Sequence, residues 1–514
     1  MAIGISLRIP RIEIDSPRFA SDQALLRIAG GSAFLFIATF FGLGLNYLYA
    51  VVLARVLGPE QFGLYALGLG CFNLLSVIAL AGLDSAVLRF VPALRAQNDA
   101  GGIATVIRSV LALSSGFSVI CAIVLVMSSD TIAIRFFHNH AVSTVLSVFA
   151  LSIPLMVVSS IYLAVLQAFR EVGWRLSVKY LCEPVVRFAA TLGMIWMGWS
   201  LMAALVALPI ALCLTTILAV LPLRGLLSIG RQSASKGNAY KSVLEYSLPL
   251  LGGLVFAGIA TRSDVLFLGH SVSLDQVGVY SAAFQTSAIM AVVLGTLESI
   301  ATPFLSESIS RNDQEQMRAL VNTLLRWTVM GTLPLCSIMA VFAKDIMSVF
   351  GSDFESGSLC LVILAIGQFV NSATGCTNGM LLWAGHSKLV MWNNIVVSAT
   401  QLGLYFILIP SYGMVGAALA ISLSLLLFAI LRTVQVRRVL ELWPYDFTVC
   451  KPLAAGGAAT LLVLVVQGVS PFTQVPMLLL LFVASYVGFL FALGIHDSDR
   501  AVLVELKRRL NQFT

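Results

Sequence analysis

The sequence carries too little charge for a protein that is solvated by water on all sides. Only 11% of its 514 residues are Asp, Glu, Lys or Arg, whereas about 25% are charged in a typical soluble domain. Hydrophobic residues make up 59% of the chain, and the mean hydropathy is +0.96. Because so few charged side chains cannot cover a water-facing surface, lipid must be the main solvent. The composition predicts an all-α polytopic membrane protein.

The sequence also lacks the motifs of catalysis and of metal binding. No G-x-x-x-x-G-K-[ST] run occurs, so we expect no ATP hydrolysis by this chain. The eight cysteines form no C-x-x-C pair and lie at no zinc-ligand spacing from a histidine, which favours unreactive, buried side chains. Asp497 and Asp499 precede an amphipathic tail and are interpreted as its N-cap and first-turn acids. We expect no enzyme activity, no catalytic residue, no metal and no organic cofactor.

Fourteen apolar runs are long enough to cross a bilayer, whose core of about 30 Å needs about 20 residues at a rise of about 1.5 Å each. They lie near 31–56, 64–90, 103–128, 142–169, 177–198, 201–223, 246–268, 278–305, 319–343, 358–384, 389–409, 413–436, 450–468 and 475–494. The connections are short, which leaves no room for a soluble catalytic domain.

The second half of the sequence repeats the first at a nearly constant offset in residue number. The acid-Gln-x-Gly-x-Tyr motif of residues 60–65 recurs at 275–280, and the Leu-acid-Ser run of 83–85 recurs at 297–299. Because six predicted spans separate the two motif copies, the repeats are parallel and are related by an axis along the membrane normal. The prediction is two pseudo-equivalent six-helix lobes followed by two further helices.

The repeat divides the chain into six predicted segments. They are a cytoplasmic N-tail at 1–30, an N-lobe of helices 1–6 at 31–223, a cytoplasmic inter-lobe loop at 224–245, a C-lobe of helices 7–12 at 246–436, helices 13–14 at 450–494 and a cytoplasmic amphipathic tail at 495–514. Of the 31 Lys and Arg residues, 25 fall on one predicted side, and only Arg55, Arg135 and Lys344 fall on the other. The positive-inside rule therefore predicts cytoplasmic termini.

The first motif copy and its surroundings resemble a known transporter family. Residues 54–67 (ARVLGPEQFGLYAL) and 83–90 (LDSAVLRF) are similar to the N-terminal signature of Wzx-type polysaccharide transport proteins. These are lipid-linked oligosaccharide flippases of the multidrug/oligosaccharidyl-lipid/polysaccharide (MOP) exporter superfamily.

The resemblance implies a function, a location and partners. It implies that an undecaprenyl-diphosphate-linked oligosaccharide, the repeat unit of a cell-surface polysaccharide or exopolysaccharide, is moved from the inner to the outer leaflet of the bacterial inner membrane. Alternating access between two lobes is the implied mechanism, with Na⁺ or H⁺ as the candidate coupling ion. Glycosyltransferases and a polymerase of the same pathway are the implied protein partners.

Charged residues inside the predicted spans are the main candidate site residues. Each costs about 2.5–3.5 kcal/mol at a helix centre, so each should face a cavity or a partner. Arg262 in span seven is a candidate diphosphate contact or an ion-pair partner of Asp264. Arg326 in span nine either reaches a cavity or pairs across helices.

Further candidates lie in spans two, five and eight. Glu183 and Arg187 are four residues apart, which favours an intrahelical ion pair, with a diphosphate contact by Arg187 as the alternative. Arg89 is interpreted as a snorkelling anchor or as a first contact for an entering diphosphate. Asp84 and Glu298 occupy equivalent places in the repeat, where they bind a coupling cation or pair with Arg89 and other basic side chains.

A polar cluster in span one stands opposite Arg262 and Asp264 in the repeat. It consists of Asn46, Tyr47 and Tyr49. Tyrosine stacks on sugar rings and also hydrogen-bonds, so the cluster is a candidate for sugar contact. Tyrosines at a membrane interface are the alternative interpretation.

Three functions remain open from the residues. A flippase predicts a cavity lined by arginine, whereas a cation-coupled multidrug or organic-cation antiporter of the same superfamily predicts a cavity lined by acids. A membrane glycosyltransferase or glycan polymerase predicts a sizeable catalytic loop, which the sequence lacks.

Overall fold

The protein is helical throughout the part that the structure describes. The computed structural model describes residues 19–223, 239–311, 314–443, 445–469 and 474–493, and these ranges contain no strand. The helices are α1 (Phe19–Leu80), α2 (Leu83–Ala96), α3 (Ala100–Arg135), α4 (Ala141–Ala168), α5 (Val172–Leu176), the π-helix η1 (Ser177–Cys182), α6 (Glu183–Trp196), α7 (Leu201–Val220), η2 (Leu221–Leu223), α9 (Ala239–Ser271), α10 (Leu274–Ser287), α11 (Ile289–Ser310), α12 (Gln314–Val341), α13 (Ala343–Ser348), η3 (Ser352–Gly357), α14 (Ser358–Ser372), α15 (Thr377–Trp383), α16 (Ser387–Val439), η4 (Phe447–Val449), α17 (Cys450–Val469) and α18 (Val475–Ala492).

The predicted membrane fold is confirmed at the level of its class. Ten helical segments within the described ranges are long and apolar enough to cross a membrane. The count of fourteen spans stays a prediction. Two of the ten segments, α1 and α16, each run through two spans that the sequence predicts separately.

A glycine kink divides each of these two long helices. In α1 the kink lies at Gly58, with a φ of 72° directly before Pro59, and in α16 it lies at Gly413, with a φ of 55°. Left-handed backbone is unfavourable for residues with a Cβ, so glycine is needed where the chain changes direction.

The prediction of one unbroken helix over 64–90 is wrong. α1 ends at Leu80, Ala81 and Gly82 have φ values of 51° and 71°, and α2 begins at Leu83. Two successive left-handed residues cannot continue a right-handed helix. Hydropathy does not reveal this break, because alanine and glycine suit an apolar span as well as a bend.

The internal repeat is visible in the backbone as well as in the sequence. Arg170 and Gly385 have φ values of 66° and 85°, and Gly198 and Gly413 have φ values of 89° and 55°. The two members of each pair are separated by the same offset as the two motif copies. Left-handed residues are uncommon, so their recurrence at this offset shows that the two halves of the chain turn at equivalent points. The predicted pair of pseudo-equivalent lobes is confirmed.

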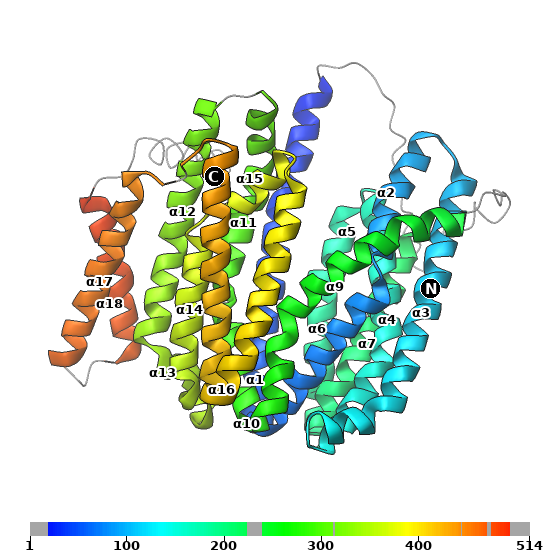
Figure 1. The fold of residues 1–514 in the computed structure, drawn as a ribbon, viewed down its shortest axis with the longest axis horizontal. Helices are drawn as coiled ribbons and strands as arrows, with labels where there is room; N and C mark the ends of the chain where they lie inside the picture. The colour runs from blue at the N-terminus through cyan, green and yellow to red at the C-terminus, as the bar shows by residue number, and fades with distance from the viewer. Residues whose placement is uncertain (1–18, 224–238, 312–313, 444, 470–473, 494–514) are drawn as a thin grey trace, which may run out of the picture.

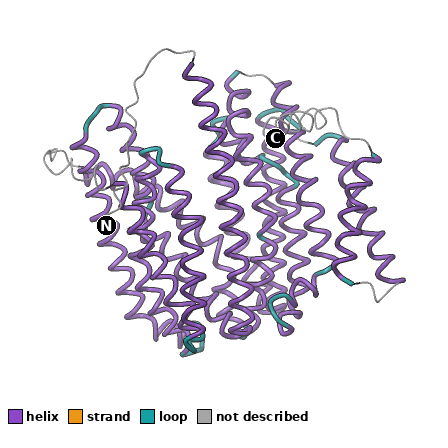
Figure 2. The backbone as a smooth tube through the Cα atoms, turned by 180° about the vertical axis from the view of Figure 1, so that it is seen from behind, coloured by secondary structure: helices purple, strands orange, loops and turns teal. Residues whose placement is uncertain are grey.

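The two lobes form bundles that meet at one end. In Figure 1, α2–α7 lie on one side and α11–α16 on the other, and α1, α10 and α16 come together at the lower edge. Figure 2 shows the same arrangement from behind. α17 and α18 flank the second bundle through α12, where the Tyr486 hydroxyl donates to the carbonyl oxygen of Met330 at 3.0 Å.

α9 connects the bundles. Its first turns place Val243 and Tyr246 against an N-lobe cluster that includes Leu83 and Val87 of α2. Its last turns lie beside α10 and α16 (Figure 1). The first helix of the second repeat therefore packs on both lobes.

The two copies of the sequence motif touch each other where the bundles meet. A Cβ added to Gly63 of α1 would overlap the carbonyl oxygen of Leu274, and a Cβ added to Gly278 of α10 would overlap that of Pro59. The repeated glycine thus allows the backbones of α1 and α10 to approach closely. We call this end of the molecule, where α1 kinks at Gly58, the motif end.

Adding a methyl group at the motif end should destabilise the fold. Gly63→Ala is expected to lower the free energy of unfolding by about 1–3 kcal/mol, because the Cβ overlaps the α10 backbone. The control is Gly193→Ala, whose Cβ meets no atom within 4 Å and which should gain about 0.5–1 kcal/mol of helix propensity. Thermal unfolding in one detergent measures both. Equal stability of the two variants would contradict the close contact.

Candidate functional site

Arg187 is held inside the N-lobe by two tyrosines of α1. It lies on α6, which ends at Trp196, and this position is about 14 Å from that end at the rise of an α-helix. Its guanidinium carbon lies 4.7 Å from the centre of the Tyr49 ring, and its Nη2 donates to the Tyr65 hydroxyl. Because α1 folds back at Gly58, this one helix supplies both neighbours. Tyr49 comes from the segment before the kink and Tyr65 from the motif after it.

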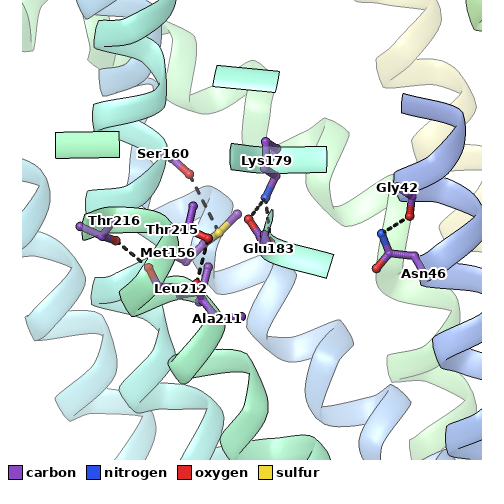
Figure 3. A network of polar contacts seen from close by, with 10 residues as sticks. All are labelled: Gly42, Asn46, Met156, Ser160, Lys179, Glu183, Ala211, Leu212, Thr215 and Thr216. Carbon is purple, nitrogen blue, oxygen red and sulfur yellow. Dashed lines mark hydrogen bonds and ion pairs between the residues drawn. The ribbon is translucent and has the colours of Figure 1, made fainter. Parts of the chain in front are cut away.

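Arg187 has no carboxylate partner among the described residues. The predicted ion pair with Glu183 is wrong, because both oxygens of Glu183 accept hydrogen bonds from Lys179 Nζ, at 3.1 and 2.9 Å. Lys179 belongs to the π-helix η1, which immediately precedes α6 (Figure 3). Sequence spacing alone allowed Lys179 or Arg187 to pair with Glu183. Lys179 forms the pair because the tyrosines of α1 hold Arg187.

One polar atom of Arg187 remains unsatisfied. Its Nε is buried and has no hydrogen-bond partner among the described residues. A buried donor without an acceptor is costly, and the cost is greater on a charged group. An anionic ligand beside Tyr65 would satisfy this atom and balance the charge.

The predicted cluster of Asn46, Tyr47 and Tyr49 is divided between three environments. Asn46 is exposed and donates to the carbonyl oxygen of Gly42 at 2.8 Å, and Figure 3 shows its side chain on the helix beside the Lys179–Glu183 pair. The Tyr47 hydroxyl lies 3.2 Å from Thr286 Oγ1 of α10, at the junction of the lobes. Tyr49 is only 5% exposed and packs inside the N-lobe.

The equivalent position in the C-lobe carries a carboxylate. Asp264 of α9 corresponds to Tyr49 in the repeat, and Tyr280 of α10 corresponds to Tyr65. The Tyr280 hydroxyl donates to Asp264 Oδ2 at 2.9 Å, and Asp264 is 1% exposed. The same tyrosine of the motif therefore binds a cation in one lobe and an anion in the other.

Gln401 and Tyr405 of α16 complete the C-lobe cluster. The Gln401 amide donates to the Tyr405 hydroxyl at 2.5 Å. Both side chains are buried. The position that corresponds to Arg187 in the repeat is Leu402, so the charge of the C-lobe cluster comes from Asp264.

The two other candidate arginines of the C-lobe are placed differently. Arg326 of α12 is 4% exposed and interacts with other groups of the chain. In this conformation its side chain is buried within the C-lobe. Arg262 belongs to α9, but its side chain lies outside the described residues, so its role stays a prediction.

Arg89 joins the N-lobe to α9. It is exposed, and its guanidinium lies 4.4 Å from the centre of the Tyr246 ring. The predicted ion pair between Asp84 and Arg89 is wrong, because Asp84 instead accepts a hydrogen bond from the backbone N–H of Ser85 at 2.8 Å. The cation–π contact, which sequence spacing does not reveal, takes the place of that pair.

Glu298 of α11 interacts with a buried arginine of α16. It interacts electrostatically with Arg432 of α16, a residue that is only 3% exposed. Arg432 also donates to Asn371 Oδ1 at 2.7 Å and to Thr374 Oγ1 at 3.0 Å. Its position inside the apolar run 413–436 was the available signal that it is buried. Arg432 therefore belongs to the C-lobe interior, and Glu298 is partly buried.

These features define a polytopic transporter fold with two repeated helical lobes and charged side chains at membrane depth. The chain belongs to the polysaccharide biosynthesis protein family, whose sequence profile matches residues 52–357. The matched range runs from α1 to η3 and includes both copies of the motif.

Individual relatives agree with this assignment, and a solved structure shares the fold. The chain is 24% identical over 406 residues to the probable low-salt glycan biosynthesis flippase Agl15 of Haloferax volcanii, covering 77% of this chain and 81% of that protein. It is 21% identical to a putative O-antigen transporter of Shigella flexneri, over 76% of this chain and 94% of that protein. The lipid II flippase MurJ, in an inward closed conformation, shares the fold with a TM-score of 0.68 over 89% of this chain and 97% of that chain, at 16% identity.

Removing the hydroxyl that binds Asp264 should destabilise the C-lobe. Tyr280→Phe is expected to lower the free energy of unfolding by about 1.5–3 kcal/mol, because a hydrogen bond to a buried carboxylate is lost. The matched control, Tyr486→Phe, removes a bond to a neutral carbonyl and should cost about 0.5–1.5 kcal/mol. Thermal unfolding in the same lipid nanodisc compares them, and a larger loss in Tyr486→Phe would contradict the assignment.

Proposed function

We propose that this chain is a flippase that moves a polyprenyl-diphosphate-linked oligosaccharide across a membrane by alternating access. The proposed cargo is the undecaprenyl-diphosphate-linked repeat unit of a surface polysaccharide or exopolysaccharide, carried from the inner to the outer leaflet. The family, the names of similar proteins and the two-lobe fold support this proposal.

The single observation that carries the proposal is the unbalanced guanidinium of Arg187. A diphosphate presents several anionic oxygens, and a planar guanidinium forms strong, charge-assisted hydrogen bonds with such groups. Arg187 holds the Tyr65 hydroxyl and lacks both an acidic partner and an acceptor for Nε among the described residues. In the proposed mechanism the prenyl chain stays in lipid while the headgroup passes between the lobes and meets this cation.

The proposed orientation places the motif end on the outer side. Arg55 lies beside the kink of α1, Arg135 at the end of α3 and Lys344 at the start of α13. The sequence assigns these three residues to the sparsely charged side of the membrane. With cytoplasmic termini in a bacterial inner membrane, the contact of the bundles at the motif end represents an inward-facing conformation. Glycosyltransferases and a polymerase of the pathway are the proposed partners.

Asp264 is the proposed binding group for a coupling ion, either Na⁺ or H⁺. It is a buried carboxylate beside two tyrosine side chains, at the position equivalent to the N-lobe site. A carboxylate at membrane depth can change its affinity for a cation when the surrounding lobe moves. In this proposal the N-lobe binds the anionic cargo and the C-lobe binds the ion.

The same carboxylate favours the second candidate function, a cation-coupled antiporter of organic cations. Arg187 argues against it, because a guanidinium without an acidic partner among the described residues of the N-lobe would repel a cationic cargo. A glycosyltransferase or polymerase is disfavoured because the connections between the described helices hold no catalytic domain. We therefore propose that the chain is no enzyme.

Loss of the Arg187 guanidinium should block transport without unfolding the protein. Arg187→Ala is expected to reduce translocation about 10- to 100-fold, as for the loss of hydrogen bonds to a charged group. The measurement is the fraction of lipid-linked oligosaccharide in the outer leaflet of cells whose only copy of the gene is the variant. Arg108→Ala, an exposed position on α3, is the control. Wild-type translocation by Arg187→Ala would exclude this residue from the site.

Loss of the Asp264 charge should uncouple transport from the ion. Asp264→Asn in proteoliposomes is expected to abolish the response of translocation to an imposed Na⁺ or pH gradient, while binding of the polyprenyl diphosphate is retained. Glu298→Gln is the control, because it removes the charge of a different, partly buried carboxylate of the C-lobe. A gradient response that persists in Asp264→Asn would remove it as the coupling group.

A further inference from the structure

Two contacts between the lobes at the motif end are equivalent under the repeat. Arg55, in the last turn of α1 before Gly58, donates through Nε to the carbonyl oxygen of Val349 at 2.6 Å. His270 corresponds to Arg55 in the repeat, lies at the end of α9 and places Nδ1 2.6 Å from the carbonyl oxygen of Phe136. In both cases the first span of one lobe contacts a carbonyl beyond the third span of the other lobe. We call these two contacts the latches.

The latches flank the contact between the two motif copies. Gly63 and Gly278 bring the backbones of α1 and α10 together, and Tyr47 reaches Thr286 of α10 at 3.2 Å. Opening the motif end therefore requires both latches to separate. The acceptor in each latch is a backbone carbonyl oxygen, so the strength of the hydrogen bond depends on the donor side chain.

The two donors differ in their response to pH. Arginine stays charged at all relevant pH values, whereas histidine changes its charge between about pH 5 and pH 8. His270 is exposed to the medium at this end. Its ring stacks on Phe136 at a centroid distance of 4.7 Å and lies 5.5 Å from the ring of His138. One latch is thus chemically constant, and the other contains titratable groups.

Acidic residues of both lobes surround the histidine latch. A pocket of about 530 Å³ is lined by Glu60, His138, His270 and Asp275, and Glu60 and Asp275 are the equivalent acids of the two motif copies. Arg135 and His140 border the same turn as His138. Closure brings the two acids to one pocket, where their repulsion opposes it unless a nearby cation compensates.

The sign of the pH effect follows from these neighbours. A hydrogen bond from Nδ1 to a carbonyl requires a proton on Nδ1, which the imidazolium always has and the neutral ring has in only one tautomer. Protonation also makes this bond charge-assisted and offsets the charges of Glu60 and Asp275. Acid conditions should therefore favour the closed latch, and neutralisation of the ring should weaken it.

We propose that His270, together with His138, is a pH-sensitive latch that holds the motif end closed in acid and releases it as the pH rises. This proposal rests on the proposed alternating access, in which the motif end opens in each cycle. It is separate from ion coupling at Asp264, since it concerns the closure of one end of the molecule and not the energy source.

Distances between the lobes test the proposal without any cargo. Spin labels at Thr131→Cys of α3 and Ser356→Cys of η3, both exposed near the motif end, are introduced after the eight native cysteines are replaced. Double electron–electron resonance in nanodiscs then gives the closed and open populations. Raising the medium from about pH 5.5 to about pH 8 is expected to lower the closed-to-open ratio about two- to fivefold, the effect of one or two exposed ionic contacts.

Three variants separate the latch from a general effect of pH. His270→Gln keeps a donor without a titratable charge, and His270→Arg copies the donor of the other latch. Both should respond less to pH than the wild type, because only His138 of the latch still titrates, and the arginine variant should be more closed. The matched control Arg55→Gln should be more open at every pH and keep the wild-type response. An unchanged pH response in His270→Gln, or wild-type distances that do not depend on pH, would overturn the proposal. Because no cargo is used, these outcomes are independent of the Arg187 experiment.

Discussion

The structure depends on the compensation of charge at membrane depth. A charged side chain in a low-dielectric environment is stable only beside a partner, and most of the described charges in the lobe interiors have one. Glu183 is held by Lys179, Asp264 by Tyr280, and Glu298 interacts with Arg432. Arg187 is engaged by tyrosines instead: its guanidinium lies over the Tyr49 ring and donates to the Tyr65 hydroxyl, while its Nε has no acceptor among the described residues.

The repeat provides one framework that carries two chemistries. The same tyrosine of the motif binds a guanidinium in the N-lobe and a carboxylate in the C-lobe, as Tyr65 and Tyr280. At the motif end, equivalent helix ends present Arg55 in one lobe and His270 in the other. Because the two lobes repeat the same backbone arrangement, they form equivalent contacts with each other. Substitutions of single side chains let each lobe bind a different charge.

Glycine controls where the lobes bend and where they touch. Gly58 and Gly413 supply the left-handed residues at which α1 and α16 change direction. Gly63 and Gly278 allow backbone contact between α1 and α10, which a methyl group would prevent. These four positions are glycines, and hydropathy cannot distinguish them from the other glycines of an apolar span.

The sequence by itself determined the class of protein, the repeat and the set of membrane-embedded charges, because low charge, long apolar runs and a constant offset are properties of the linear chain. The sequence did not determine which side chains pair with one another. Glu183 has a basic residue four positions before it and another four positions after it. Only the fold shows that Lys179 forms the ion pair with Glu183, while Tyr49 and Tyr65 contact Arg187. The break at Gly82, the burial of Arg432 and the latches at Arg55 and His270 were likewise decided by tertiary structure. The physical reason is that a hydrogen bond or an ion pair depends on which helices lie side by side, and in lipid almost every apolar helix face is an acceptable neighbour until packing selects one.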